Sequence, residues 1–181
     1  MMIKRQTKGN IKNQAISLIN KEKLNIGSGE DYKEGWLNID CRNNVISDLK
    51  WNLNDFPYPF KDNTFNEVFM SMILEHLNEP IKCLKEISRI SKNGSKIKII
   101  VPHASSYANL TDIQHKTNFT ENSFNTELLK EYELETLKLV GKKFLFPKNK
   151  WKRYIPFKKY LKIFFNGVYD DLLFEFLIKK T

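Results

Sequence analysis

The early part of the chain contains two features that together could bind a nucleoside. A short apolar strand, predicted at residues 23–26, runs into Gly27-Ser28-Gly29. Glycines in such a turn let the backbone approach a ligand closely and leave amide groups free to donate. Asp40 ends the next predicted strand, residues 36–40, where a carboxylate can accept hydrogen bonds from both hydroxyls of a ribose. Taken separately, the glycines could form a common turn and the aspartate could cap a turn. The order of a strand with a glycine turn, followed by a strand that ends in an acid, favours a nucleoside site.

Two of the three histidines lie on a loop that follows a later predicted strand, residues 95–101. His103 and His115 flank Asp112 there, at the edge where open α/β sheets bind ligands. Histidine titrates near neutrality and therefore suits proton transfer. The spacing of these residues matches no known metal-site pattern, so no metal ion is predicted.

Strands and helices alternate along the chain and position these residues on one sheet. Strands are predicted at residues 23–26, 36–40, 65–72, 95–101 and 172–178, with weaker candidates at 44–51 and 134–146. Helices are predicted at residues 11–19, between an Asn78 cap and an Asn93-Gly94 end, and after Thr120. This alternation indicates an α/β fold with a mainly parallel sheet, and we expect one domain over residues 1–181.

The connection between the first two strands is short. Only residues 30–34 separate Gly29 from Gly35, whereas a parallel crossover normally takes a dozen or more residues and includes a helix. The first helix is therefore expected to be missing or reduced to a turn. A pyrophosphate would need that helix N-terminus, so the short connection argues against a dinucleotide or a P-loop nucleotide.

Four segments resemble the type 11 methyltransferases that depend on S-adenosylmethionine (SAM). They are Leu-Asn-Ile-Gly-Ser-Gly, Gly-Trp-Leu-Asn-Ile-Asp, Phe-Pro-Tyr-Pro-Phe-Lys-Asp-Asn-Thr-Phe-Asn-Glu-Val and Ile-Leu-Glu-His-Leu. The resemblance extends over residues 24–124 and looks closest to a compact bacterial and archaeal branch. It implies a class I, Rossmann-like methyltransferase sheet, mainly parallel with an antiparallel last strand, and SAM as the cofactor.

The same resemblance implies a role for each matching residue. Gly27, Ser28 and Gly29 would face the methionine part of SAM, and Asp40 would hold the ribose. The remaining cofactor residues would be Asn52 and Leu53 beside the adenine, with Met72 and His76 after the fourth strand. The family usually has an aspartate in place of Asn52, whose amide donates as well as accepts. Alternatively, Glu75 and His76 only begin a helix while Leu74 and Leu77 pack.

The histidine loop would then form the acceptor side of the pocket, because the related branch has a similar pattern there. Methyl transfer is an in-line displacement, in which a hydroxyl acceptor must also lose its proton. We predict His115 as the base and Asp112 as the residue that orients it, with His103 as the rival base. The alternative is structural, with Asp112 capping a turn and His115 bonded to the backbone.

Residues 142–165 are rich in both basic and aromatic side chains. Such a segment could contact a membrane surface or another anionic partner. The alternative is a helix that packs its aromatic residues on the sheet. Four of them recur at steps of three and four residues, namely Tyr154, Phe157, Tyr160 and Phe164.

The composition is ordinary for a soluble globular protein, and the net charge is +9. No apolar run approaches the roughly 20 residues of a membrane-spanning helix, and the first residues lack the apolar core of a signal peptide. Cys41 and Cys83 are too few for a disulfide framework, so a cytoplasmic location is expected.

The predicted activity is SAM-dependent methyl transfer to an oxygen or nitrogen of a small-molecule or glycosidic acceptor. The related branch often accompanies cell-surface polysaccharide synthesis, which suggests a sugar or lipid-linked sugar. One alternative is a non-catalytic methyltransferase-fold partner protein. A nucleic-acid-binding methyltransferase is less favoured, because no Asn/Asp-Pro-Pro-Tyr/Phe tetrapeptide follows the fourth strand.

Overall fold

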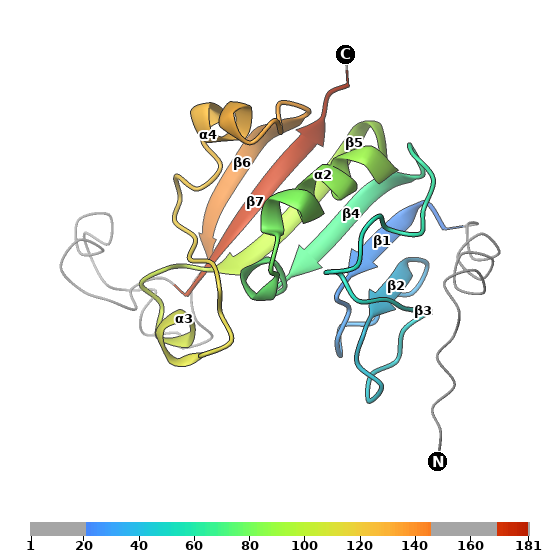
Figure 1. Cartoon of the computed structure of the whole chain (residues 1–181), viewed down its shortest axis with the longest axis horizontal. Helices are drawn as coiled ribbons and strands as arrows, with labels where there is room; N and C mark the ends of the chain where they lie inside the picture. The colour runs from blue at the N-terminus through green and yellow to red at the C-terminus, as the bar shows by residue number, and fades with distance from the viewer. Residues whose placement is uncertain (1–20, 146–169, 181) are drawn as a thin grey trace.

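The computed structural model describes residues 21–145 and 170–180, which form a seven-stranded sheet with helices packed against it (Figure 1). The strand order is β3-β2-β1-β4-β5-β7-β6. The strands are β1 (Lys23–Ile26), β2 (Leu37–Asp40), β3 (Leu49–Lys50), β4 (Phe65–Ser71), β5 (Ser91–Pro102), β6 (Leu137–Leu145) and β7 (Asp171–Ile178). Strands β1 to β5 are parallel, and β7 lies antiparallel between β5 and β6. The predicted Rossmann-like sheet with an antiparallel last strand is confirmed.

The order of the parallel strands places a ligand crevice beside β1. The chain runs outward from β1 to β2 and β3, and then returns to build β4 and β5 on the other side. Open α/β sheets bind ligands at the carboxyl ends of strands where the order reverses in this way. Gly27 follows β1 and Met72 follows β4, so these two predicted cofactor residues lie beside the crevice.

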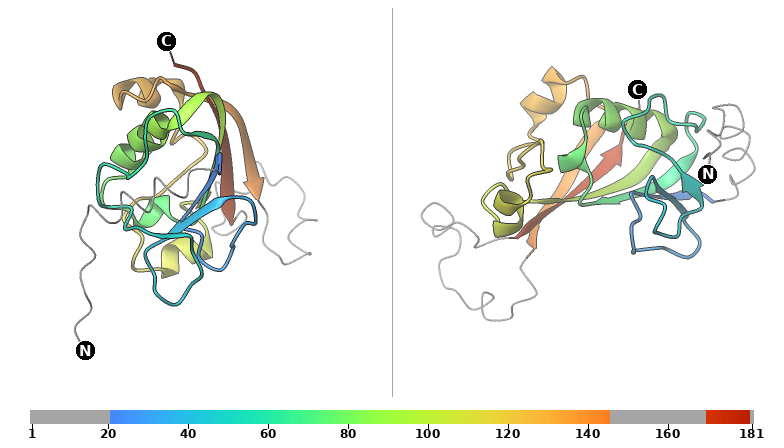
Figure 2. Two further views of the ribbon diagram at one scale, coloured as in Figure 1. Left: turned by 90° about the vertical axis from the view of Figure 1, so that its right-hand side faces the viewer. Right: turned by 60° about the horizontal axis from the view of Figure 1, so that its bottom comes forward.

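Two helices cover one face of the sheet, as Figure 1 and the edge-on view of Figure 2 show. They are α2 (Pro80–Ile90) and α4 (Thr126–Glu131), while η1 (Leu74–His76) and α3 (Tyr107–Thr111) lie on loops at the carboxyl edge. Helix α2 begins with a proline, which suits a first turn. Its buried residues recur every three or four positions and face the sheet, as expected for an amphipathic helix.

The ends of the helices differ from the predictions. Glu79, not Asn78, is the N-cap of α2, and the helix ends at Ile90 because Ser91 already begins β5. Gly94, with φ 81°, instead lies within β5 where the register with β4 shifts. Helix α4 is capped by the Asn125 side chain rather than opened by Thr120. The strand predicted at residues 44–51 is reduced to β3, and the helix predicted at residues 11–19 lies outside the described residues.

The crossover from β1 to β2 contains no helix, as predicted; residues 27–36 form turns. Two buried asparagines hold these turns against the sheet. Asn25 Nδ2 donates to the Asp31 carbonyl at 2.7 Å. Asn38 Nδ2 donates to the carbonyls of Lys33 and Trp36, and its Oδ1 accepts from the Lys33 amide at 2.9 Å. The side-chain amides therefore satisfy backbone groups that a crossover helix would have satisfied internally.

The second face of the sheet is partly polar. In β5, Ile97 and Ile99 are fully buried, whereas Lys96 and Lys98 alternate with them and point away from α2. Parallel sheets are usually covered on both faces and made of continuous apolar residues. The alternation therefore fits a sheet on which the described helices cover one face (Figure 2). Among the described residues no helix is long and apolar enough to cross a membrane.

Candidate cofactor cleft and acceptor loop

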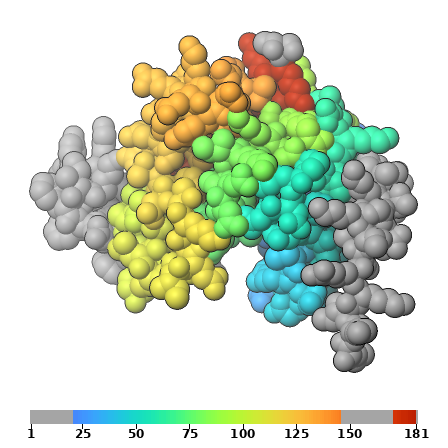
Figure 3. Space-filling model, in the orientation of Figure 1, coloured from blue at the N-terminus to red at the C-terminus, as the bar shows by residue number. Residues whose placement is uncertain are grey.

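Two adjoining hollows lie at the carboxyl ends of β1, β2 and β4. The first has a volume of about 360 Å³ and the second about 300 Å³. They share four lining residues, namely Gly27, Arg42, Met72 and Ile73. Figure 3 shows a notch between the loop of residues 103–118, in yellow, and the region of β1 to β3, in blue. The hollows therefore form one elongated cleft, open on the side of the histidine loop.

The glycine turn forms the floor between the two hollows. Gly27 has φ 64° and Gly29 has φ 52°, a left-handed conformation that favours glycine. A Cβ atom on Gly27 would lie 2.2 Å from Ile73 Cδ1, so a larger residue would force the Ile73 side chain to move. Met72 also has a positive φ, 53°. A non-glycine residue in this conformation stores strain of the kind that collects at binding sites.

Asp40 is 4% exposed and both of its oxygens are engaged. The amides of Gly29 and Arg42 each donate to the carboxylate at 2.8 Å, and Arg42 Nε lies 3.3 Å from Oδ1. Burial opposes ionisation, but these donors hold the pKa of Asp40 below its usual value. A carboxylate has about four acceptor positions, so two remain for ribose hydroxyls once the Arg42 side chain moves.

The far end of the first hollow is suited to a flat apolar ring. Trp51 and Leu53 line it together with Asn52. Asn52 Oδ1 already accepts from the Asn54 amide at 3.1 Å, so its NH₂ group remains to donate to a ligand. Trp51 was not predicted from the sequence, although its place directly after β3 and next to Asn52 was a usable signal.

His115 lies in the loop of residues 103–118, here called the acceptor loop after its predicted role, and its hydrogen bonds define its tautomer. Asn109 Nδ2 donates to the Asn118 Oδ1 atom at 2.8 Å and to the Ala104 carbonyl at 3.2 Å. Asn109 Oδ1 is therefore the acceptor for His115 Nδ1, 3.1 Å away. This bond leaves the proton on Nδ1 and the lone pair on Nε2. Asp112 Oδ2 lies 3.6 Å from Nε2, which is an ion-pair distance for a protonated ring rather than a hydrogen bond.

His103 occupies a different environment from His115. It is 7% exposed, and its Nδ1 accepts from the Ser105 amide at 3.1 Å. Its Nε2 faces Glu121 Oε2 at 3.5 Å. The structure thus places Asp112 beside His115 without a hydrogen bond between them, and Asp112 Oδ1 accepts from the Gln114 amide at 2.8 Å, as a turn cap does. His103 is directed toward Glu121. Asn109, which orients His115, was not found from the sequence because nothing in its spacing distinguishes it.

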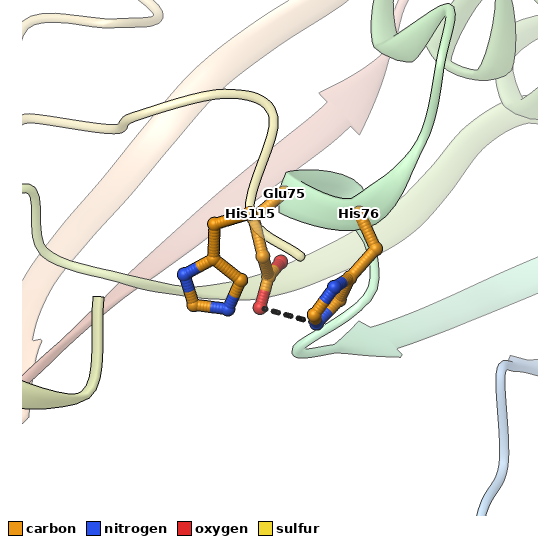
Figure 4. Close-up of side chains that lie close together, drawn as sticks. All are labelled: Glu75, His76 and His115. Atoms are coloured by element: carbon orange, nitrogen blue, oxygen red, sulfur yellow. Dashed lines mark ion pairs between the residues drawn. The ribbon is translucent and has the colours of Figure 1, made fainter. Parts of the chain in front are cut away.

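Glu75 and His76 lie on η1 and meet His115 from the opposite side (Figure 4). The rings of His76 and His115 pack edge to face with centroids 4.7 Å apart. Burial, followed by the charges of Asp171 and Asp112, raises the pKa of Glu75 to about 7. Burial and the neighbouring His115 lower the pKa of His76. Leu74 and Leu77 are buried, so the motif both packs and supplies polar groups to the site.

The comparisons with known proteins agree with this geometry. Residues 27–99 match a family described as a methyltransferase domain. The structure is similar to that of a SAM-dependent methyltransferase from Archaeoglobus fulgidus, with a TM-score of 0.66 and 18% identity over 96% of this chain and 95% of that one. The chain has the class I methyltransferase fold.

Two other solved methyltransferase structures are similar. One, in a complex of the Haloferax volcanii Trm112 methyltransferase activator with a methyltransferase, matches with a TM-score of 0.61 and 15% identity over 93% of this chain and 89% of that one. The other is Haemonchus contortus phosphoethanolamine N-methyltransferase 2 in complex with SAM, with a TM-score of 0.55 and 13% identity over 93% of this chain and 53% of that one.

A curated relative matches only a short part of this methyltransferase-fold chain. An uncharacterised protein of Methanocaldococcus jannaschii is 51% identical over 43 residues, which are 24% of this chain and 19% of that protein. The family match over residues 27–99 includes every predicted cofactor residue from Gly27 to His76. His103, Asp112 and His115 lie beyond it, so their roles depend on the geometry alone.

Proposed function

We propose that the protein transfers the methyl group of SAM to an oxygen or nitrogen of a small-molecule or glycosidic acceptor. The observation that carries the proposal is the elongated cleft itself. It joins a buried carboxylate, a glycine turn and an apolar end at the point where the strand order of the sheet reverses. A nucleoside with a flexible amino-acid tail matches these three features in that order.

In this proposal each half of SAM occupies one hollow. The adenosine would lie in the first, with its ribose hydroxyls on Asp40 and its base beside Trp51 and Leu53. The methionine part would lie in the second, over the amides of the glycine turn. Glu30 and Asp31 line that hollow, and their negative charge suits the ammonium group of the methionine.

The methyl acceptor would enter from the side of the acceptor loop. His76 and Gln114 line the first hollow, and His76 packs against His115. In this proposal the lone pair of His115 Nε2 accepts the proton of a hydroxyl acceptor. Asp112, 3.6 Å away, would stabilise the imidazolium that forms. His103 stays the alternative base.

Calorimetric titration of SAM and of S-adenosylhomocysteine into the purified protein tests the cofactor site. We expect both ligands to bind, and Asp40→Ala to weaken binding by at least about tenfold, because each charged hydrogen bond contributes about 1.5–3 kcal/mol. Asp62→Ala is the matched control, since Asp62 is exposed and pairs with Arg89 far from the cleft. Failure of the unaltered protein to bind either ligand would contradict the proposal.

A second candidate is a methyltransferase-fold subunit that functions with a protein partner. Two observations favour it: the similar Haloferax chain is in a complex with an activator, and Arg42 occupies the carboxylate of Asp40. Arg42→Ala separates the candidates. If the protein is a SAM-dependent enzyme whose ribose site Arg42 blocks, this variant binds SAM more tightly than the unaltered protein. If the protein is a subunit that has lost its SAM site, neither form binds SAM.

A further inference from the structure

Three side chains with metal-binding atoms converge where η1 meets the acceptor loop. One ligand atom from each of Glu75, His76 and His115 lies within 4.8 Å of the others. Figure 4 shows the three side chains meeting, with the carboxylate of Glu75 beside both imidazole rings. The residues come from two segments nearly forty positions apart, so their convergence is a property of the fold rather than of one motif.

We propose that Glu75, His76 and His115 bind a divalent transition-metal ion, with Zn²⁺ the best match. Two imidazoles and one carboxylate are a donor set of zinc sites that keep a coordination position open. With metal–ligand bonds near 2.0–2.1 Å, tetrahedral ligand atoms lie about 3.3 Å apart. Side-chain movements of about 1 Å would therefore close the present arrangement around an ion.

The burial of Glu75 supports a cation at this place. The residue is 1% exposed; Oε1 lies 3.9 Å from His76 Nε2, and no described residue hydrogen-bonds to Oε2. A buried carboxylate without a partner is costly unless it is neutralised or coordinates an ion. Asp112 adds further negative charge beside His115. An ion would thus remove an unfavourable feature of the structure.

The surroundings also hold the imidazoles as metal ligands require. A ligating histidine normally donates its other ring N–H to a neighbouring oxygen, which fixes the ring. Asn109 Oδ1 accepts from His115 Nδ1 and leaves the Nε2 lone pair for the ion. The His76 ring packs edge to face against His115, with centroids 4.7 Å apart. The backbone carbonyl of Glu75 accepts from the Lys116 amide at 2.7 Å, which ties the loop to η1 without the ion.

A bound ion has a consequence for the activity proposed above. It would use the same lone pair of His115 that removes the acceptor proton, so the two states exclude each other. Zn²⁺ is therefore expected to suppress methyl transfer while SAM still binds, because Asp40 and the glycine turn are not ligands. This consequence rests on the proposed function, whereas metal binding does not.

The test is calorimetric titration of Zn²⁺ into untagged protein that has been stripped of metal. We expect one equivalent to bind, and His76→Ala and His115→Ala each to weaken affinity by at least about tenfold. Visible absorption of bound Co²⁺ gives a second readout that does not depend on activity. His103→Ala is the matched control, because this buried histidine of the same loop contacts Ser105 and Glu121 instead.

Glu75→Gln keeps the shape of the side chain and removes its charge, and circular dichroism checks that each variant folds. The proposal is overturned if the unaltered protein binds no stoichiometric Zn²⁺, or if folded His76→Ala and His115→Ala bind it as tightly as His103→Ala does. Failure of SAM to bind would leave these zinc measurements unaffected and would contradict only the methyltransferase proposal.

Discussion

At the scale of single residues, Gly27 is constrained by its conformation and by its neighbour. A left-handed non-glycine residue costs about 1–2 kcal/mol, and a Cβ on Gly27 would also lie 2.2 Å from Ile73 Cδ1. Gly35 is the matched control, since its φ is 75° but no atom lies within 4 Å of its added Cβ. We expect Gly27→Ala to lower the free energy of unfolding by about 1–3 kcal/mol more than Gly35→Ala. Urea denaturation of the two variants measures the difference, and equal losses would contradict the contact with Ile73.

The tautomers of two histidines provide a second test at this scale. We expect His115 to carry its proton on Nδ1, because Asn109 Oδ1 accepts it, and His103 to carry its proton on Nε2, because Nδ1 accepts from Ser105. Long-range ¹H–¹⁵N NMR at alkaline pH distinguishes the two forms. In Asn109→Ala, His115 should populate both tautomers while His103 stays unchanged. The same tautomer for both rings in the unaltered protein would refute this assignment.

Site residues could be predicted from the sequence where they directly follow a strand. Gly27 and Asp40 were predicted from their place at the ends of strands, because parallel strands bring their carboxyl ends to one edge. Asn52 was predicted only through the family resemblance. Arg42 and Ile73 were not predicted, since they enter the cleft through side-chain packing across the sheet edge. Spacing along the chain carries no information about such contacts.

At the scale of elements, buried asparagines replace the helix that the first crossover lacks. Asn38 is fully buried and its side chain bonds Lys33, Trp36 and other groups. Asn38→Leu would leave those backbone groups unpaired, and each such group costs about 1–3 kcal/mol. We expect a loss of about 2–4 kcal/mol in urea denaturation. Asn43→Leu, at an exposed position three residues after β2 ends, should change stability little, and similar losses for both would refute the role of Asn38.

Asp48 supports the same crossover and predicts a dependence of stability on pH. Burial opposes ionisation of its carboxyl, but hydrogen bonds from Asn38, Tyr32 and Lys21 hold its pKa below the usual value. The folded state therefore favours the carboxylate, so the stabilisation is present above the unfolded pKa near 3.8 and is lost as the pH falls through the folded pKa. Asp48→Asn should lower stability at neutral pH and flatten its decline in acid. Urea denaturation measures the free energy of unfolding at each pH. An equally steep decline in acid for the two proteins would contradict this prediction.

Strands could be predicted more accurately than helix ends. The buried strands β1, β4 and β5 have apolar side chains at positions that the core requires, so their composition indicates them directly. The end of α2 was misplaced because Asn93-Gly94 is a strong helix-stop signal, while the backbone leaves the helix earlier, at Ser91. The pairing of Ser91 with Phe65 in the sheet determines the C-terminal end of α2. Such a pairing between distant residues cannot be predicted from the local sequence.

At the scale of the whole molecule, strand order depends on long-range pairing. The alternation of strands and helices indicated a parallel sheet, and the resemblance supplied the antiparallel last strand. Neither revealed that α2 and α4 cover the same face (Figure 2). The polar alternation of Lys96 and Lys98 in β5 was the sequence signal for it, because a strand covered on both faces has no reason to alternate.

The sheet ends at β6 in the described part of the chain, and an exposed edge strand can pair with another molecule. Lysine side chains and a register shift near Gly141 discourage such pairing. Lys138→Val would create an apolar edge beside Val140, which is already 58% exposed. We expect this variant to self-associate with rising concentration in analytical ultracentrifugation. Lys96→Val removes the same charge from β5, whose backbone is paired with both β4 and β7, so it should stay at the oligomeric state of the unaltered protein. Association of both variants would mean that lost charge, rather than the exposed edge, drives it.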